Sequence, residues 1–179
     1  TLALEELLSQ YDAVILAAGT HAPYRPDLPG VSLPGVQHGL EFLRTANSGG
    51  AASIGRRVVV IGGGFTAVDC ARMAKRLGAE SVRMLYRRSE KEMYGTPGEV
   101  EEIGHEGIAV ETLSVPVAFL GDIAVSAVRF RRAKMGAPDA SGRASFEEVP
   151  GSEFEVEADT VLLATGQKAD EHWLSDEER

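Results

Sequence analysis

The feature that most constrains this chain is a short run of β-branched residues followed by three glycines and then by a stretch of helical periodicity. The run covers Val58 to Ile61, the periodic stretch covers Phe65 to Leu77, and Gly78 stands where a C-terminal helix cap belongs. A second strand is expected over Ser81 to Tyr86. These residues predict a strand, a tight turn, a helix and a second strand, which together form the βαβ unit of a parallel sheet.

The glycine turn carries the chemistry that the sequence offers. Its residues fit the G-x-G-x-x-A pattern, in which the first glycine permits the tight turn, the second lets the backbone approach a pyrophosphate, and the alanine keeps the helix close to the sheet. The N-terminus of the helix then presents unpaired N–H groups and a partial positive charge to the phosphates. The residues predicted to bind the pyrophosphate are Gly62, Gly63, Gly64, Phe65, Thr66 and Ala67.

The end of the second strand decides which dinucleotide the turn would hold. A site for NAD places Asp or Glu here, about 20 residues after the glycines, to bind the ribose 2′-hydroxyl. In this chain the strand is followed by Arg87 and Arg88, and Glu80 lies before the strand, at its wrong end. Guanidinium groups are fixed forks of donors that suit a 2′-phosphate. The sequence therefore favours NADP(H), unless the two arginines are an ordinary solvated surface pair.

Two similar apolar runs flank this unit. Asp12 to Gly19 reads DAVILAAG, and Asp159 to Gly166 reads DTVLLATG. A continuous apolar run that stops at glycine is typical of a strand buried in a parallel sheet. We therefore expect one strand over Ala13 to Ala18 and another over Asp159 to Ala164, with equivalent ends at the two glycines.

The remaining segments predict a linker, a further helix and a small antiparallel addition. In residues 21–55, early prolines and late Asn-Ser-Gly-Gly indicate a linker with one short helix at Leu40 to Thr45. Thr96 to Glu99 reads as a capping box that begins a helix ending at Gly107. From Val110 to Arg132, turn signals and alternating polarity predict a hairpin or small meander with one wet face.

Composition excludes several other function classes. The 179 residues carry a net charge of −9, and hydrophobic residues make up 44%, which suits a soluble globular domain and argues against a nucleic-acid partner. The single cysteine, Cys70, can form neither an internal disulfide nor a CxxC pair, and the four histidines lack zinc spacing. No run is long enough for a membrane span, so we expect a cytoplasmic protein with no membrane partner. No catalytic acid/base pair and no metal ligand is predicted.

In combination, these segments resemble a known family, the flavoprotein NADPH-oxidoreductases typified by the small (β) subunit of bacterial glutamate synthase. The ordered combination is far more specific than the glycine motif alone. The matching pieces run nearly from end to end: YDAVILAAGT (11–20), PDLPGVSLPGV (26–36), VVVIGGGFTAVDCARMAKRLGA (58–79), VRMLYRR (82–88), EGIAVETLSVPVAFLGD (106–122), KMGAPDASGR (134–143) and ADTVLLATGQKAD (158–170).

The resemblance implies an α/β fold of the pyridine nucleotide-disulphide oxidoreductase type, which has two dinucleotide-binding domains. A Rossmann-like parallel sheet with an appended antiparallel β-meander would be inserted into an FAD domain. Residues 1–20 would be a terminal piece and crossover from the FAD domain, 21–55 the linker, 56–166 the NAD(P)H-binding domain and 167–179 the return crossover. The residues implied to line the approach to the nicotinamide are Gly19, Thr20, Gly166 and Gln167.

The same resemblance implies a function for a longer parent protein, in which NADPH passes hydride to FAD and electrons continue to iron–sulfur clusters or an acceptor subunit. The family's FAD fingerprint, its later Gly-Asp flavin motif and its cysteine-rich cluster region are absent from these 179 residues. We therefore expect an excised NADPH-binding domain that holds no flavin and is inactive alone. Its partners would be its own FAD domain, the iron–sulfur region and an acceptor subunit. The alternative is a regulatory Rossmann module that senses NADP(H) and transfers no hydride.

Overall fold

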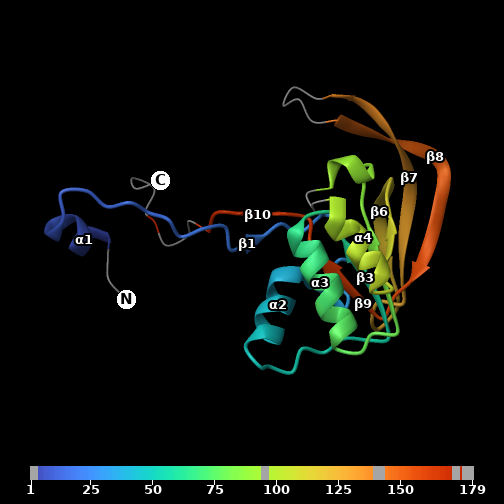
Figure 1. Cartoon of the computed structure of the whole chain (residues 1–179), viewed down its shortest axis with the longest axis horizontal. Coiled ribbons are helices and arrows are strands. Elements are labelled where there is room, and N and C mark those ends of the chain that lie inside the picture. The colour runs from blue at the N-terminus through green and yellow to red at the C-terminus, as the bar shows by residue number, and fades with distance from the viewer. Residues whose placement is uncertain (1–3, 94–96, 139–143, 171–173, 175–179) are drawn as a thin grey trace. The chain divides into compact units, whose positions relative to one another are not determined.

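The computed structural model describes residues 4–93, 97–138, 144–170 and 174. Contacts between residues divide the chain into two units, residues 1–22 with 167–179 and residues 23–166. The elements, labelled in Figure 1, are α1 (Leu4–Gln10), β1 (Ala22–Pro23), β2 (Val36–His38), α2 (Gly39–Asn47), β3 (Arg57–Ile61), α3 (Phe65–Arg76), β4 (Ser81–Leu85), the 3-10 turn η1 (Glu90–Glu92), α4 (Pro97–His105), β5 (Ala109–Glu111), β6 (Ser114–Leu120), β7 (Ala127–Pro138), β8 (Ala144–Glu157), β9 (Thr160–Leu163) and β10 (Gln167–Lys168).

The larger unit is built in three layers around a parallel sheet with the strand order β2-β9-β3-β4-β5. Alternate residues of β3 belong to two separate apolar clusters. Val58 and Val60 pack with the helices, whereas Val59 and Ile61 pack with the antiparallel sheet β6-β7-β8. Because both faces of the parallel sheet are covered, its central strands need no polar alternation. The expected fold class is confirmed.

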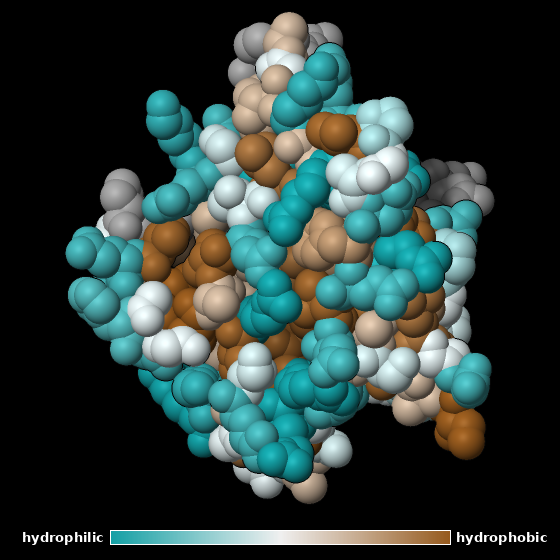
Figure 2. All heavy atoms as spheres, turned by 90° about the vertical axis from the view of Figure 1, so that its right-hand side faces the viewer, coloured by the Kyte–Doolittle hydropathy of each residue, from teal (hydrophilic) through white to brown (hydrophobic). Residues whose placement is uncertain are grey.

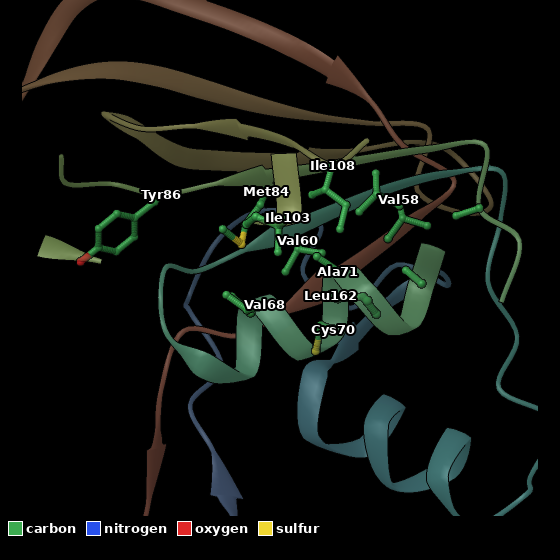
Figure 3. Close-up of a cluster of buried hydrophobic side chains, with 14 of the residues drawn as sticks. Val58, Val60, Val68, Cys70, Ala71, Met84, Tyr86, Ile103, Ile108 and Leu162 are labelled. Atoms are coloured by element: carbon green, nitrogen blue, oxygen red, sulfur yellow. The ribbon is translucent and has the colours of Figure 1, made fainter. Parts of the chain in front are cut away.

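The predicted strand, turn, helix and strand are present as β3, α3 and β4. The side of α3 that faces the sheet carries Ala67, Ala71 and Ala74, all fully buried, so the helix can approach the strands closely. Figure 3 shows the sheet side chains, Val60 and Met84 among them, directed toward α3. The helix ends at Arg76, and Gly78 adopts a φ of +96°, the left-handed conformation of a helix cap.

The antiparallel sheet has the one wet face that its sequence predicts. Val128 and Phe130 are fully buried, while the alternate residues Arg129 and Arg131 point outward. Their guanidinium groups pair with Glu155 and Glu153 across the β7–β8 ladder. Figure 2 shows hydrophilic residues spread over this side of the molecule, with hydrophobic residues between them.

The expected segment from Val110 to Leu120 is divided between two sheets. β5 pairs in parallel with β4, and β6 pairs antiparallel with β7. Between them Leu113 has a φ of +54°, which is uncommon for a residue with a side chain. Hydrogen bonds hold its backbone on both sides, from its N–H to the Arg88 carbonyl and from the Ala133 N–H to its own carbonyl. The bend is therefore imposed by tertiary contacts.

The segment 21–55, expected to be a linker with one short helix at Leu40 to Thr45, contains that helix as α2, whose Phe42 is buried in the core. It also contains the sheet strand β2, which was not expected. Proline and glycine mark local irregularity, but they do not reveal that the short segment between them pairs with β9.

The expected capping residue Thr96 lies outside the described residues, and α4 begins at Pro97.

The strand expected over Ala13 to Ala18 is wrong for this structure, which has no strand there. Ile15 is 90% exposed, and Leu16 is exposed as well. The similar run β9 is completely buried because it lies between β2 and β3. An apolar run becomes a strand only when neighbouring strands pair with its backbone and cover its faces, and in the described residues none pairs with 13–18.

The smaller unit contains α1, β10 and Ala22 of β1. Among the helices of the described residues, none combines the length and the apolar character that a membrane crossing requires.

Candidate functional site

The first glycine of the turn between β3 and α3 is held on both sides by neighbouring strands. Gly62 has a φ of +152°, and a Cβ atom built there would lie 2.4 Å from the carbonyl oxygen of Ala164, just after β9. The Gly62 N–H donates to the Leu85 carbonyl at the end of β4, with an N···O distance of 3.0 Å. Only glycine fits this position, and the turn therefore has a defined place at the carboxyl edge of the sheet.

The second glycine is covered by an aromatic ring. A Cβ atom on Gly63 would lie 2.5 Å from Cδ2 of Tyr86, the residue that follows β4. Tyr86 is 8% exposed, and its hydroxyl donates to the Glu92 carbonyl at 2.9 Å. Because both ends of the Tyr86 side chain are fixed, its ring forms a rigid support under the turn.

The third glycine faces open space. Apart from Gly64 itself and its two chain neighbours, no heavy atom lies within 4 Å of a Cβ atom built on Gly64, which is the N-cap of α3. Its carbonyl accepts the N–H groups of Ala67 and Val68, as the start of a helix requires. The open side of the turn is thus its Gly64 side, where no residue beyond its chain neighbours Gly63 and Phe65 fills the space.

The electrostatics at this end of α3 favour an anion. The first turn of the helix contains no acidic residue, while Lys75 and Arg76 lie in the last turn. The positive end of the helix dipole is therefore not neutralised by a carboxylate. Of the predicted residues that begin α3, Phe65 is 56% exposed, Thr66 is half-buried and Ala67 is fully buried against the sheet.

The structure places Arg87 and Arg88 at the same edge of the sheet as the glycine turn. β4 pairs with β3 so that Leu85 lies opposite Ile61, and both strands end at this pair. Arg87 is exposed, and its Cζ lies over the ring of Phe146, 5.3 Å from the ring centre. Arg88 is half-buried, and its Nε donates to the Ala144 carbonyl at 2.9 Å. In the described residues neither arginine forms an ion pair with a carboxylate.

The other predicted residues lie at the ends of the two units. In the smaller unit, Thr20 Oγ1 donates to Gln167 Oε1 at 3.3 Å, and Gly19 lies beside His21. In the larger unit, the Gly166 carbonyl accepts the Tyr24 N–H at 2.9 Å. The structure thus brings Thr20 and Gln167 together. Their role at a nicotinamide stays a prediction.

Reactive side chains are not part of this site. Cys70 is completely buried on α3, and this burial, followed by the charge of Asp69, raises the pKa of its thiol to about 12. Figure 3 shows Cys70 at the side of α3 near α2, where its Sγ would lie 2.7 Å from a Cβ atom on Gly39. The part of the chain that the structure describes holds no group of three His, Cys, Asp or Glu residues placed to bind a metal. The arrangement is suited to binding and positioning.

Sequence reasoning missed three members of the site. The sequence predicts Tyr86 only as the last residue of a strand, although its place directly before two arginines is visible there. Phe146 and Ala144 had no local signal, because they reach Arg87 and Arg88 from a distant hairpin. Only the register of β7 with β8 brings them there.

Comparisons with known proteins agree on one family. Residues 4–177 match the family described as pyridine nucleotide-disulphide oxidoreductase. The chain is 44% identical over 180 residues to the NADPH-Fe(3+) oxidoreductase subunit beta of Geobacter sulfurreducens, covering 98% of this chain and 27% of that one. It is 41% identical to the glutamate synthase [NADPH] small chain of Halomonas elongata, covering 90% of this chain and 36% of that one.

Solved structures agree on the fold. The structure titled Mycobacterium tuberculosis FprA in complex with NADPH matches with a TM-score of 0.80 at 21% identity, over 94% of this chain and 53% of that chain. Thioredoxin reductase of T. acidophilum matches with a TM-score of 0.59 at 19% identity, over 87% of this chain and 44% of that one. The chain therefore spans about half or less of the length of each protein named here.

Proposed function

Because the chain belongs to the pyridine nucleotide-disulphide oxidoreductase family, we propose that it is the NADPH-binding part of a larger flavin-dependent oxidoreductase of the glutamate synthase small-chain type. The names of its relatives, an NADPH-Fe(3+) oxidoreductase subunit and a glutamate synthase [NADPH] small chain, support NADPH as the electron donor. The observation that carries the proposal is the open glycine turn beside two arginines that no carboxylate of the described residues neutralises.

The turn fits the pyrophosphate of a dinucleotide on the geometry of its glycines. The sides of Gly62 and Gly63 are closed by Ala164 and Tyr86, whereas Gly64 leaves the space that a phosphate would need. The N–H groups at the start of α3 point along the helix axis toward that side, and the helix dipole adds attraction for negative charge. The residues that would hold the pyrophosphate are Gly62, Gly63, Gly64, Phe65, Thr66 and Ala67.

The two arginines fit the 2′-phosphate, which distinguishes NADPH from NADH. Arg87 is the stronger candidate, because its guanidinium is exposed and its contact with the Phe146 ring leaves its positive charge intact. Arg88 has one donor engaged with the Ala144 carbonyl, and its remaining donors would assist. A ribose hydroxyl would give these groups far less than a phosphate dianion.

The chemistry of the whole protein would come from its cofactors. When bound, NADPH supplies a hydride and FAD accepts it, with electrons passing to iron–sulfur clusters or an acceptor subunit. This chain's own contribution is positioning, so the lack of an acid/base pair fits the proposal. Thr20 and Gln167, with Gly19 and Gly166, would line the approach to the nicotinamide.

Calorimetry with the 179-residue chain tests the coenzyme assignment. NADPH should bind more tightly than NADH, and Arg87→Ala should remove most of that difference, worth about 1.5–3 kcal/mol for a charge-assisted contact. Arg76→Ala, an exposed arginine in the last turn of α3, is the matched control and should leave both affinities unchanged. Equal affinities of the unaltered chain for the two coenzymes would contradict the assignment.

A second measurement separates the oxidoreductase from a module that only senses NADP(H). The natural protein that contains this chain should hold FAD and reduce a dye with NADPH. The sensing alternative predicts coenzyme binding with neither flavin nor turnover.

A further inference from the structure

The hairpin of β7 and β8 reaches back to the end of β4. Phe146 and Ala144 lie on its β8 strand and contact Arg87 and Arg88, which follow β4 directly. The pairing of Met135 with Phe146 and of Pro138 with Ala144 in the antiparallel ladder determines where these two residues stand. A segment far along the chain therefore contacts both guanidinium groups of the proposed coenzyme site.

We infer that the β7–β8 hairpin is a specificity-determining element, in which Phe146 is a positioning residue that holds Arg87 ready for the 2′-phosphate of NADPH. This inference rests on the function proposed above. Phe146 itself need not touch the coenzyme, because it acts through the guanidinium that lies over its ring.

The choice of partners supports this role. On the outer face of the antiparallel sheet β6-β7-β8, which contains the hairpin, the arginines Arg129 and Arg131 are paired with glutamates, which neutralise their charge. Arg87 and Arg88 instead receive a neutral ring and a neutral carbonyl. Such partners fix a guanidinium in place and leave its full positive charge for an arriving anion.

The contact with Phe146 would strengthen phosphate binding by reducing the conformational entropy that the Arg87 side chain loses on binding. A free arginine side chain has many accessible rotamers, and part of that freedom is lost when it binds a phosphate. Contact with Phe146 removes some of that freedom before the coenzyme arrives. The ring offers no acceptor atom, so the N–H donors of Arg87 stay available for the phosphate oxygens.

The acidic residue next to Phe146 in the sequence is already paired. The next residue, Glu147, is paired with Lys134 across the ladder, with an N···O distance of 2.9 Å. Its carboxylate is therefore compensated within the hairpin, and it does not draw Arg87 away from the ring.

The test compares Phe146→Leu with Phe146→Tyr by calorimetry with NADPH and NADH. Loss of the ring in Phe146→Leu should weaken NADPH binding about two- to fivefold and leave NADH binding unchanged. Phe146→Tyr keeps an aromatic face and should therefore keep the preference for NADPH of the unaltered chain. In an Arg87→Ala background, Phe146→Leu should have no further effect on that preference, because the residue through which it acts is gone.

Phe154→Leu is the matched control, since the Phe154 ring lies under Arg132, a second arginine over a phenylalanine ring, which is also paired with Glu111. It should lower Tm and keep the ratio of NADPH to NADH affinity. A Phe146→Leu chain that keeps the original ratio, or loses affinity for both coenzymes equally, overturns the role of the hairpin while the proposed function stands. An unaltered chain without preference for NADPH overturns both.

Discussion

The ring of Tyr86 lies against Gly63 so closely that a Cβ atom on the glycine would stand 2.5 Å from Cδ2 of the ring. The contact joins the end of β4 to the turn after β3. Since the Tyr86 hydroxyl is also fixed to the Glu92 carbonyl, the turn is supported by a side chain that cannot easily move. The shape of the proposed phosphate cradle thus depends on both strands.

Replacing Gly63 with alanine should therefore disturb the whole turn. The added methyl group must displace the Tyr86 ring, and overpacking of this kind costs about 1–3 kcal/mol in the free energy of unfolding. Urea unfolding measures that loss, and calorimetry should show that NADPH and NADH lose affinity together. Unchanged stability of Gly63→Ala would show that the ring is not fixed against the turn.

Gly64→Ala should have the opposite profile. Gly64 has a φ of −107°, which alanine adopts freely, and beyond its two chain neighbours its Cβ atom would meet no protein atom within 4 Å. Stability should change by no more than about 0.5 kcal/mol, while affinity for both coenzymes falls because the methyl group occupies the space proposed for the pyrophosphate. Full retention of NADPH binding by this variant would place the phosphates elsewhere.

Arg88→Ala should combine a loss of stability with a loss of affinity. The Arg88 Nε donates to the Ala144 carbonyl, so its removal frees part of the β8 strand and should cost about 1 kcal/mol in the free energy of unfolding. Arg87→Ala, which breaks no hydrogen bond in the described structure, should keep the original stability. Thermal unfolding of the two variants side by side measures the difference. Equal Tm values would mean that Arg88 has no structural role.

Stability should fall in acid partly through Asp159. The Arg57 side chain, through its hydrogen bonds to this carboxylate, holds the pKa of Asp159 below its usual value. A lowered folded-state pKa gives stability that is complete above the ordinary aspartate pKa of about 3.9 and is lost as pH falls through the folded-state pKa. Asp159→Asn should therefore cost about 1 kcal/mol at pH 7, and that cost should shrink steadily in acid.

Urea unfolding at pH 7 and at pH 3 measures this change. Glu157→Gln is the control, because Glu157 also pairs with Arg57 but is largely exposed, and its removal should have little effect at either pH. A cost of Asp159→Asn that is the same at both pH values would contradict the assignment to the ion pair.

Cys70 should be unreactive while the chain is folded. With a thiol pKa of about 12, roughly one thiol in ten thousand is ionised at pH 8, and the side chain is also buried. Alkylation at pH 8 should be slow without denaturant and fast in concentrated urea. Rapid modification of the folded chain, followed by mass spectrometry, would show that α3 opens far more readily than its burial indicates.

How much of the fold and of the candidate site could be predicted from the sequence differs from element to element. The unit β3-α3-β4 was fully visible, because β-branched residues, glycines and a small-residue helix face all act over a few neighbouring positions. The different contacts of Arg87 and Arg88 could not be predicted, since they depend on Phe146 and Ala144 in a different sheet. The alternation of β7 predicted its wet face but gave no information on where its hairpin would lie.

The two apolar runs show where local information ends. DTVLLATG and DAVILAAG are similar sequences, yet the first forms the buried strand β9 and the second is exposed and unpaired in the described structure. The sequence by itself determined the strand–glycine–helix unit, because backbone conformation and side-chain periodicity are local properties. Only the tertiary structure decided which apolar run is buried, which glycine of the turn stays open and what holds each arginine. These depend on neighbours that lie far apart along the chain and meet only when the sheets assemble.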